Sequence, residues 1–81
     1  MSAQVVWPQY IFEVLRELPA KQRGAILEKV DVLQHFPRMY PVRGGGRFRR
    51  YRWFVAGQWL VYYRLVGETV YIRALWPARL P

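Results

Sequence analysis

The chain has no cysteine and only one histidine, one serine and one threonine among its 81 residues. Without cysteine it forms neither a disulfide nor a thiolate metal site, and this composition fits the reducing cytoplasm, where we expect the protein to act. No apolar run approaches the roughly 18 residues needed to cross a bilayer, and no secretion signal is visible. We therefore expect no membrane association, no metal and no cofactor.

Acidic residues are also few, and they lie in one half of the sequence. The chain has 13 Lys+Arg against 5 Asp+Glu, a formal net charge of +8. Residues 1–37 carry four basic and four acidic residues, whereas residues 38–81 carry nine arginines and one acid, Glu68, so that 9 − 1 = +8. Arginine makes forked contacts with phosphate and carboxylate groups. This asymmetry predicts an anionic partner, with an ordinary solvated basic face as the alternative.

Apolar spacing predicts two helices followed by three strands. Ile11, Val14, Leu15 and Leu18 fall on one face of a helix, which Pro19 separates from the next helix. We predict one α+β domain over residues 1–81 in the order β-α-α-β-β-β, a four-stranded, mostly antiparallel sheet with a helical hairpin on one face and its first strand antiparallel to its second. The expected strands are residues 3–7, 47–55, 58–66 and 69–76, and the expected helices are residues 10–18 and 20–36.

Both faces of the predicted sheet are rich in apolar residues, although the helices can cover only one of them. We assign Leu60, Tyr62 and Arg64 to the helix-covered face, where Arg64 would either pair with Glu13 or Glu17 or act in function. The other face should bind a partner protein, or a second copy of the chain in a homodimer. Its residues are Trp59, Val61, Tyr63, Tyr71 and Arg73.

The segment YPVRGGGRFRRYRWFV, residues 40–55, combines three glycines with five arginines. It lacks the lysine and the following helix of a phosphate-binding P-loop. Arginines interleaved with aromatic residues suit stacked or phosphate-rich partners, and they equally suit arginine stems that cover an apolar sheet. We take Arg47, Arg49 and Arg50 as candidate target-binding residues and keep nucleic-acid binding as one possible function.

Groups suited to catalysis are scarce. His35 lies near the end of the second predicted helix, where its cation would favour the helix dipole. A ribonuclease would need a base to activate a ribose hydroxyl and a cation to stabilise the phosphorus centre. Arginines can supply the cation, but the only nearby bases are tyrosines such as Tyr51 or Tyr63, whose ordinary pKa of about 10 is poorly matched to neutral pH. A non-enzymatic function is therefore favoured, and no catalytic residue is assigned.

Several segments, in order, resemble the RelE/ParE superfamily of bacterial toxins. They include Trp7 before the first helix, Leu15 within it, LQHFP at residues 33–37 and Gly46-Arg47 before the second strand. The best segment is WLVYYRLVGETVYIRALWPAR, residues 59–79, in which Arg64, Arg73 and Arg79 fall at arginine positions of the ParE-like pattern. The resemblance implies the toxin of a type II toxin–antitoxin, or plasmid-stabilisation, module.

The superfamily contains two kinds of activity. RelE-like members are ribosome-dependent, metal-independent mRNA endoribonucleases with an arginine early in the third strand, where this chain has Trp59. ParE-like members are thought to inhibit DNA gyrase, and they often have His-Gly where this chain has Trp76-Pro77. The resemblance thus implies a gyrase inhibitor that an acidic-tailed antitoxin neutralises, with the mRNA nuclease as the alternative and a basic nucleic-acid-binding domain as the second. Arg47, Arg49, Arg50, Arg73 and Arg79 are the candidate target-binding residues.

Overall fold

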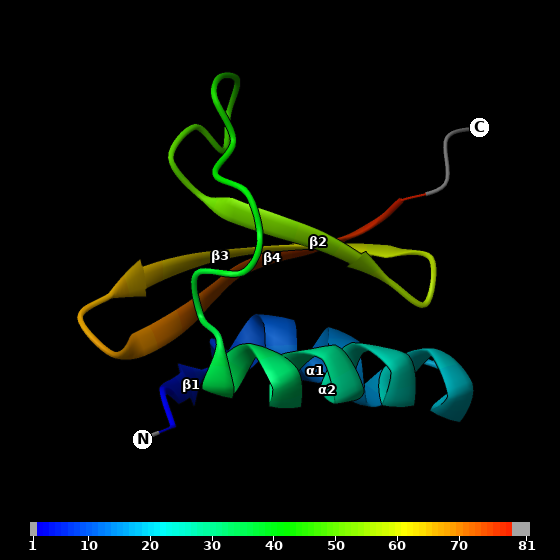
Figure 1. The fold of residues 1–81 in the computed structure, drawn as a ribbon. Coiled ribbons are helices and arrows are strands. Elements are labelled where there is room, and N and C mark those ends of the chain that lie inside the picture. Colours follow the sequence, from blue (N-terminus) through cyan, green and yellow to red (C-terminus); the bar gives the residue numbers. More distant parts are fainter. Residues whose placement is uncertain (1, 79–81) are drawn as a thin grey trace.

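A computed structural model describes residues 2–78 and confirms an α+β fold with two helices and a four-stranded mixed sheet. Both helices lie against the same face of the sheet (Figure 1). The chain order of the elements agrees with the predicted order. The elements are β1 (Gln4–Val6), α1 (Gln9–Glu17), α2 (Ala20–His35), β2 (Arg52–Ala56), β3 (Trp59–Val66) and β4 (Thr69–Pro77).

The strands lie in the order β1-β4-β3-β2. The β2–β3 and β3–β4 pairs are antiparallel, as predicted for the meander, whereas β1 pairs with β4 in parallel. The predicted antiparallel pairing of the first strand with the second is therefore wrong. The Gln4 amide donates to the Glu68 carbonyl at 3.0 Å, which holds β1 beside the start of β4. The Ala3 amide donates to the Gln34 carbonyl at 2.8 Å and ties the chain before β1 to the end of α2.

Each helix begins directly after a proline. The start of a helix suits proline because its φ is fixed and because an amide hydrogen there would have no partner within the helix. Pro8 precedes α1 and Pro19 precedes α2, so the Leu18-Pro19 pair makes the break between them. Of the apolar positions predicted for the first helix, Val14 is exposed, whereas Ile11 and Leu15 are buried. Ile26, Val30 and Leu33 of α2 are buried as well. They pack on one side of the sheet with Phe54, Val61, Tyr63, Val70, Ile72 and Leu75, which we call the main core.

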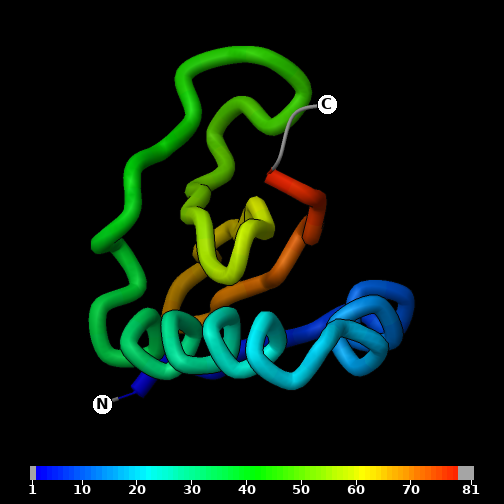
Figure 2. Tube along the Cα trace, turned by 90° about the vertical axis from the view of Figure 1, so that its right-hand side faces the viewer, coloured from blue at the N-terminus to red at the C-terminus, as the bar shows by residue number. Residues whose placement is uncertain are grey.

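The strand predicted over residues 47–55 begins five residues later, at Arg52. Residues 47–50 form a turn instead, with the Arg49 amide bonded to the Gly46 carbonyl and the Tyr51 amide to the Phe48 carbonyl. Gly46 and Arg50 have φ values of 81° and 75°, which reverse the chain on both sides of Phe48. Arg47, Arg49 and Arg50 therefore lie on a loop, and the strand alternation predicted for them is wrong. The loop rises from the side of the sheet opposite the helices (Figures 1 and 2).

Phe48 folds back from this loop onto the sheet and forms a second, smaller core. Its ring stacks on Tyr62 with centroids 4.1 Å apart, and Phe48, Tyr62 and Ala74 are all buried. Tyr51, Trp53 and Leu60 pack around them. The face opposite the helices is thus partly covered by the loop between α2 and β2, a cover that strand periodicity does not reveal.

A β-bulge in β4 changes which side chains face the helices. Tyr62 is opposite Ala74 and Tyr63 is opposite Ile72, so Arg73 has no opposing residue in β3. An extra residue of this kind shifts the alternation of the strand by one position. Ala74 consequently joins the second core and Leu75 the main core, which is the reverse of what unbroken alternation along β4 would give.

The turn between β2 and β3 requires glycine for two separate reasons. Gly57 has φ +56°, and a Cβ atom there would lie 3.0 Å from the backbone oxygen of Gln22 in α2. Gly67 has a similar φ of +59° but opens into free space. We expect Gly67→Ala to cost about 1 kcal/mol from the left-handed backbone alone, and Gly57→Ala about 2–3 kcal/mol because the helix must also move. Urea unfolding of both variants checks the difference; equal losses would contradict the close contact with α2.

Candidate binding site on the sheet face opposite the helices

Three of the five residues predicted for the open face lie on the helix-covered side. Val61 and Tyr63 have no exposed surface, and the Trp59 indole Nε1 donates to Gln22 Oε1 of α2 at 2.8 Å. The predicted placement of Trp59, Val61 and Tyr63 is therefore wrong. Both alternating sets of β3 are apolar, so periodicity alone does not indicate which set the helices cover. Tyr71 and Arg73 are exposed on the opposite side, as predicted.

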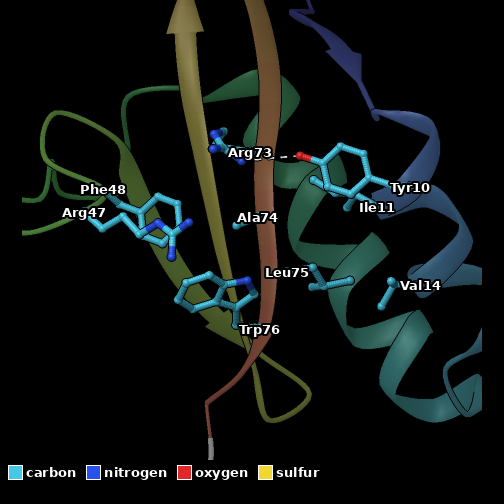
Figure 3. Close-up of a pocket in the computed structure, with 9 residues that line it drawn as sticks. All are labelled: Tyr10, Ile11, Val14, Arg47, Phe48, Arg73, Ala74, Leu75 and Trp76. Carbon is cyan, nitrogen blue, oxygen red and sulfur yellow. Dashed lines mark hydrogen bonds between the residues drawn. The ribbon is translucent and has the colours of Figure 1, made fainter.

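A cavity of about 200 Å³ lies over the second half of β4. Tyr10, Ile11 and Val14 of α1 line one side of β4, and Arg47 and Phe48 of the loop lie on the other side (Figure 3). Residues 73–76 of β4 complete the lining. The cavity thus combines an apolar wall from α1 with two arginines.

The two arginines of the cavity rest on aromatic rings. The Arg73 guanidinium carbon lies 5.9 Å from the Phe48 ring centroid, and Arg73 Nη1 donates to the Tyr10 hydroxyl at 3.3 Å (Figure 3). The Arg47 guanidinium carbon lies 5.8 Å from the Trp76 ring. Phe48 and Trp76 contact each other edge to face, with centroids 5.0 Å apart. Among the residues that the structure describes, no aspartate or glutamate lines the cavity, so both cations remain available to an anionic ligand.

Arg64 lies on this same face, next to a second hollow of about 400 Å³ lined also by Tyr51, Tyr71 and Arg73. It is exposed and stands opposite Tyr71 in the β3–β4 register. Because α1 covers the other face, the predicted ion pair of Arg64 with Glu13 or Glu17 is wrong. The structure instead brings Arg64 and Arg73 together beside two tyrosines.

The remaining predicted arginines are Arg49, Arg50 and Arg79. Arg49 and Arg50 are exposed on the loop, and the Arg50 amide donates to the Arg43 carbonyl at 2.9 Å, which closes the loop around Gly44, Gly45 and Gly46. Arg52, which the sequence did not single out, donates through Nη1 to the carbonyls of Arg38 and Tyr40 and so fixes the start of the loop. Arg79 lies outside the described residues.

Tyr63 has a structural role that the sequence did not indicate. Its hydroxyl donates to the Pro37 carbonyl at 2.8 Å and anchors the chain where it leaves α2. Burial raises the pKa of Tyr63 to about 12. A phenol with this pKa holds its proton throughout the neutral range, so Tyr63 does not serve as a general base.

The raised pKa of Tyr63 predicts a loss of stability in alkaline solution. The folded-state pKa lies above the ordinary value of about 10, so the stabilisation is complete below pH 10 and is lost as the pH rises towards about 12. Tyr63→Phe should cost about 1–2 kcal/mol at neutral pH, because the Pro37 carbonyl loses its donor, and should reduce the alkaline loss. Urea unfolding across this pH range measures both effects. The exposed Tyr71→Phe is the control, and an unchanged alkaline loss in Tyr63→Phe would contradict the assignment.

Other kinds of site find no support among the described residues. No group of histidine, aspartate and glutamate in residues 2–78 could hold a metal ion. No helix in the same residues is long and apolar enough to cross a membrane. No family model, no curated protein and no solved structure matches the chain.

Proposed function

We propose that this protein is the toxin of a type II toxin–antitoxin module, that it arrests growth in the cytoplasm by binding DNA gyrase, and that an acidic-tailed antitoxin neutralises it. The observation that carries the proposal is the cluster of Arg47, Arg64 and Arg73 on the face opposite the helices. Within residues 2–78, no acidic side chain lines either hollow beside them. The sequence resemblance supplies the family, and the cluster supplies a surface for an anionic partner.

The choice of gyrase over mRNA cleavage rests on the scarcity of bases. Cleavage of RNA without a metal needs a group that removes a proton from the 2′-hydroxyl. Burial raises the pKa of Tyr63 to about 12, and its hydroxyl is bonded to Pro37. Of the two tyrosines considered as bases, Tyr51 and Tyr63, only Tyr51 then remains, and it lies on the same face as the arginines. This supports a non-enzymatic inhibitor and keeps the RelE-like nuclease as the alternative.

A second candidate function is binding of single-stranded nucleic acid. It is favoured by the Arg47–Trp76 and Arg73–Phe48 pairs, because arginines placed on aromatic rings beside an open cavity suit bases and phosphates together. Binding of this kind depends strongly on salt. An oligothymidine titration at two salt concentrations would detect it.

Induced expression in a bacterial host separates the two toxin activities. The proposal predicts growth arrest with an SOS response and intact transcripts, because a blocked gyrase damages DNA and leaves mRNA whole. Primer extension on cellular mRNA provides the second measurement. Codon-phased cleavage would replace gyrase by the ribosome-dependent nuclease, and unimpaired growth would contradict the toxin assignment itself.

Co-expression with the neighbouring gene tests the antitoxin. A small gene beside this one should encode a protein with an acidic tail, and its product should restore growth and co-purify with the toxin. Failure on both counts would contradict the proposed pairing. Light scattering of the isolated chain tests the homodimer, which the net charge of +8 on each copy disfavours.

A further inference from the structure

The sheet has a strand, β4, that is paired along only about a third of its outer edge. β4 has nine residues and β1 has three, and the last pair between them is Val6 with Tyr71. Beyond that pair the chain turns through Trp7 and Pro8 into α1. Within the described residues, no strand therefore accompanies β4 on this side after Tyr71, and its backbone donors and acceptors there are free to pair.

The cavity lies along this free edge. Arg73, Ala74, Leu75 and Trp76 line it from β4, and Tyr10, Ile11 and Val14 face them from α1 (Figure 3). Tyr10 and Val14 are exposed apolar side chains. Side chains of an added strand alternate between two sides. One set would contact the apolar wall of α1, and the other would lie on the side of the arginines.

Charge selects among the possible occupants of the edge. Arg73 is the extra residue of the bulge, it lies directly on the free edge, and Arg47 stands beside Trp76 above it. A second copy paired at the same edge would bring its own arginines against these, at a repulsive cost. A strand that carries carboxylates meets attraction at the same positions.

We propose that the free edge of β4 at residues 73–76 binds an extended acidic segment of another protein, which adds to the sheet as a strand. Its carboxylates pair with Arg73 and Arg47, and its apolar side chains fill the cavity against Tyr10 and Val14. Main-chain hydrogen bonds supply affinity in this mode, and the side-chain pattern supplies specificity. The inference rests on the proposed function, because it places the acidic tail of the antitoxin at this edge.

Short synthetic peptides test the strand pairing separately from the charge. The probe is a capped peptide in which glutamate and valine alternate, titrated into the purified chain and followed by calorimetry. A second peptide carries N-methyl groups on its valines, which removes backbone donors without changing charge. We expect the N-methylated peptide to bind about tenfold more weakly. Equal affinity of the two peptides would overturn the proposal, since charge attraction alone would then explain binding.

Variants of the chain locate the site. Arg73→Glu should weaken binding of the glutamate–valine peptide about tenfold. Arg38 is an exposed arginine that lines a different hollow, so Arg38→Glu should change the affinity for the peptide by less than about twofold. Equal effects of the two variants on peptide affinity would show that the peptide does not bind at the free edge of β4. Oligothymidine that displaces the peptide and binds more tightly would assign the edge to nucleic acid. A dimer of the isolated chain that Arg73→Glu alters would assign it to a second copy.

The antitoxin itself separates failure of this inference from failure of the proposed function. If the neighbouring gene product restores growth and binds the Arg73→Glu variant as tightly as the unaltered chain, the edge is not its site and the toxin assignment stands. If the chain never arrests growth but binds the acidic peptide through backbone pairing, the edge site stands and the toxin assignment fails.

Discussion

Phe48→Ala is expected to lower the free energy of unfolding by about 3 kcal/mol, the usual cost of removing a buried phenylalanine. The ring is buried, it stacks on Tyr62 at 4.1 Å, and it contacts Tyr51 and Trp76 edge to face. A chain of this length has a total stability of about 4–12 kcal/mol. Loss of one loop residue should therefore remove a large share of it, and urea unfolding with a constant m-value measures the loss.

Phe12→Ala is the matched control for this prediction. Phe12 lies on α1 with 42% of its surface exposed. We expect the same substitution there to change stability by less than about 1 kcal/mol, because most surface changes are small. If Phe48→Ala were as mild as Phe12→Ala, the loop would not be held on the sheet by Phe48, and the second core would contribute little.

Arg73→Ala is expected to abolish growth arrest while the fold is retained. Arg73 is exposed, and its contacts are the Phe48 ring and the Tyr10 hydroxyl, so its removal should cost less than about 1 kcal/mol of stability. Arg73 lines both hollows of the candidate site, which makes it the arginine whose loss should affect partner binding most. Growth curves after induction, with the melting temperature of the purified variant, measure the two properties.

Other arginine variants serve as comparisons for Arg73→Ala. Arg16→Ala, an exposed arginine on α1, should leave growth arrest intact. Arg64→Ala should leave the melting temperature nearly unchanged, because its side chain is exposed and not paired under the helices. Arg79→Ala, outside the described residues, is also expected to abolish growth arrest. If Arg73→Ala and Arg79→Ala both remain fully toxic, the effector site moves to the arginines at 47, 49, 50 and 52.

The helices and the meander follow directly from local patterns in the sequence. Ile11 and Leu15 recur at helical spacing and are buried, and Pro19 ends the first helix as expected. Gly57 and Gly67 mark the two-residue turns, both with positive φ. These features depend on neighbours a few residues apart, so residue order alone carries the information.

Which side chains of a strand point toward the helices depends on contacts between residues that are distant in sequence, so alternation alone does not predict it. Both alternating sets of β3 are apolar, and only packing against Ile26 and Leu33 places Val61 and Tyr63 inside. The bulge at Arg73 then shifts the second half of β4 by one position. No local pattern signals either event.

The candidate site was predicted in part. Arg47 was selected by its charge and its aromatic neighbours in the sequence, and Arg73 by its place on the open face and by the family resemblance; the structure brings both to one cavity. Tyr10, which holds Arg73 through its hydroxyl, was missed because it is 63 residues away in sequence. Phe48 was read as a strand residue, although the three glycines before it are the signal for a turn.

Supercoiling of a relaxed plasmid by purified DNA gyrase, titrated with the purified chain, is the direct test of gyrase inhibition by this protein. We expect supercoiling to fall as the chain is added, Arg73→Ala to remove this inhibition, and Arg16→Ala to retain it. Undiminished supercoiling with the chain in excess over gyrase, from a preparation that still arrests growth when expressed, would contradict gyrase inhibition.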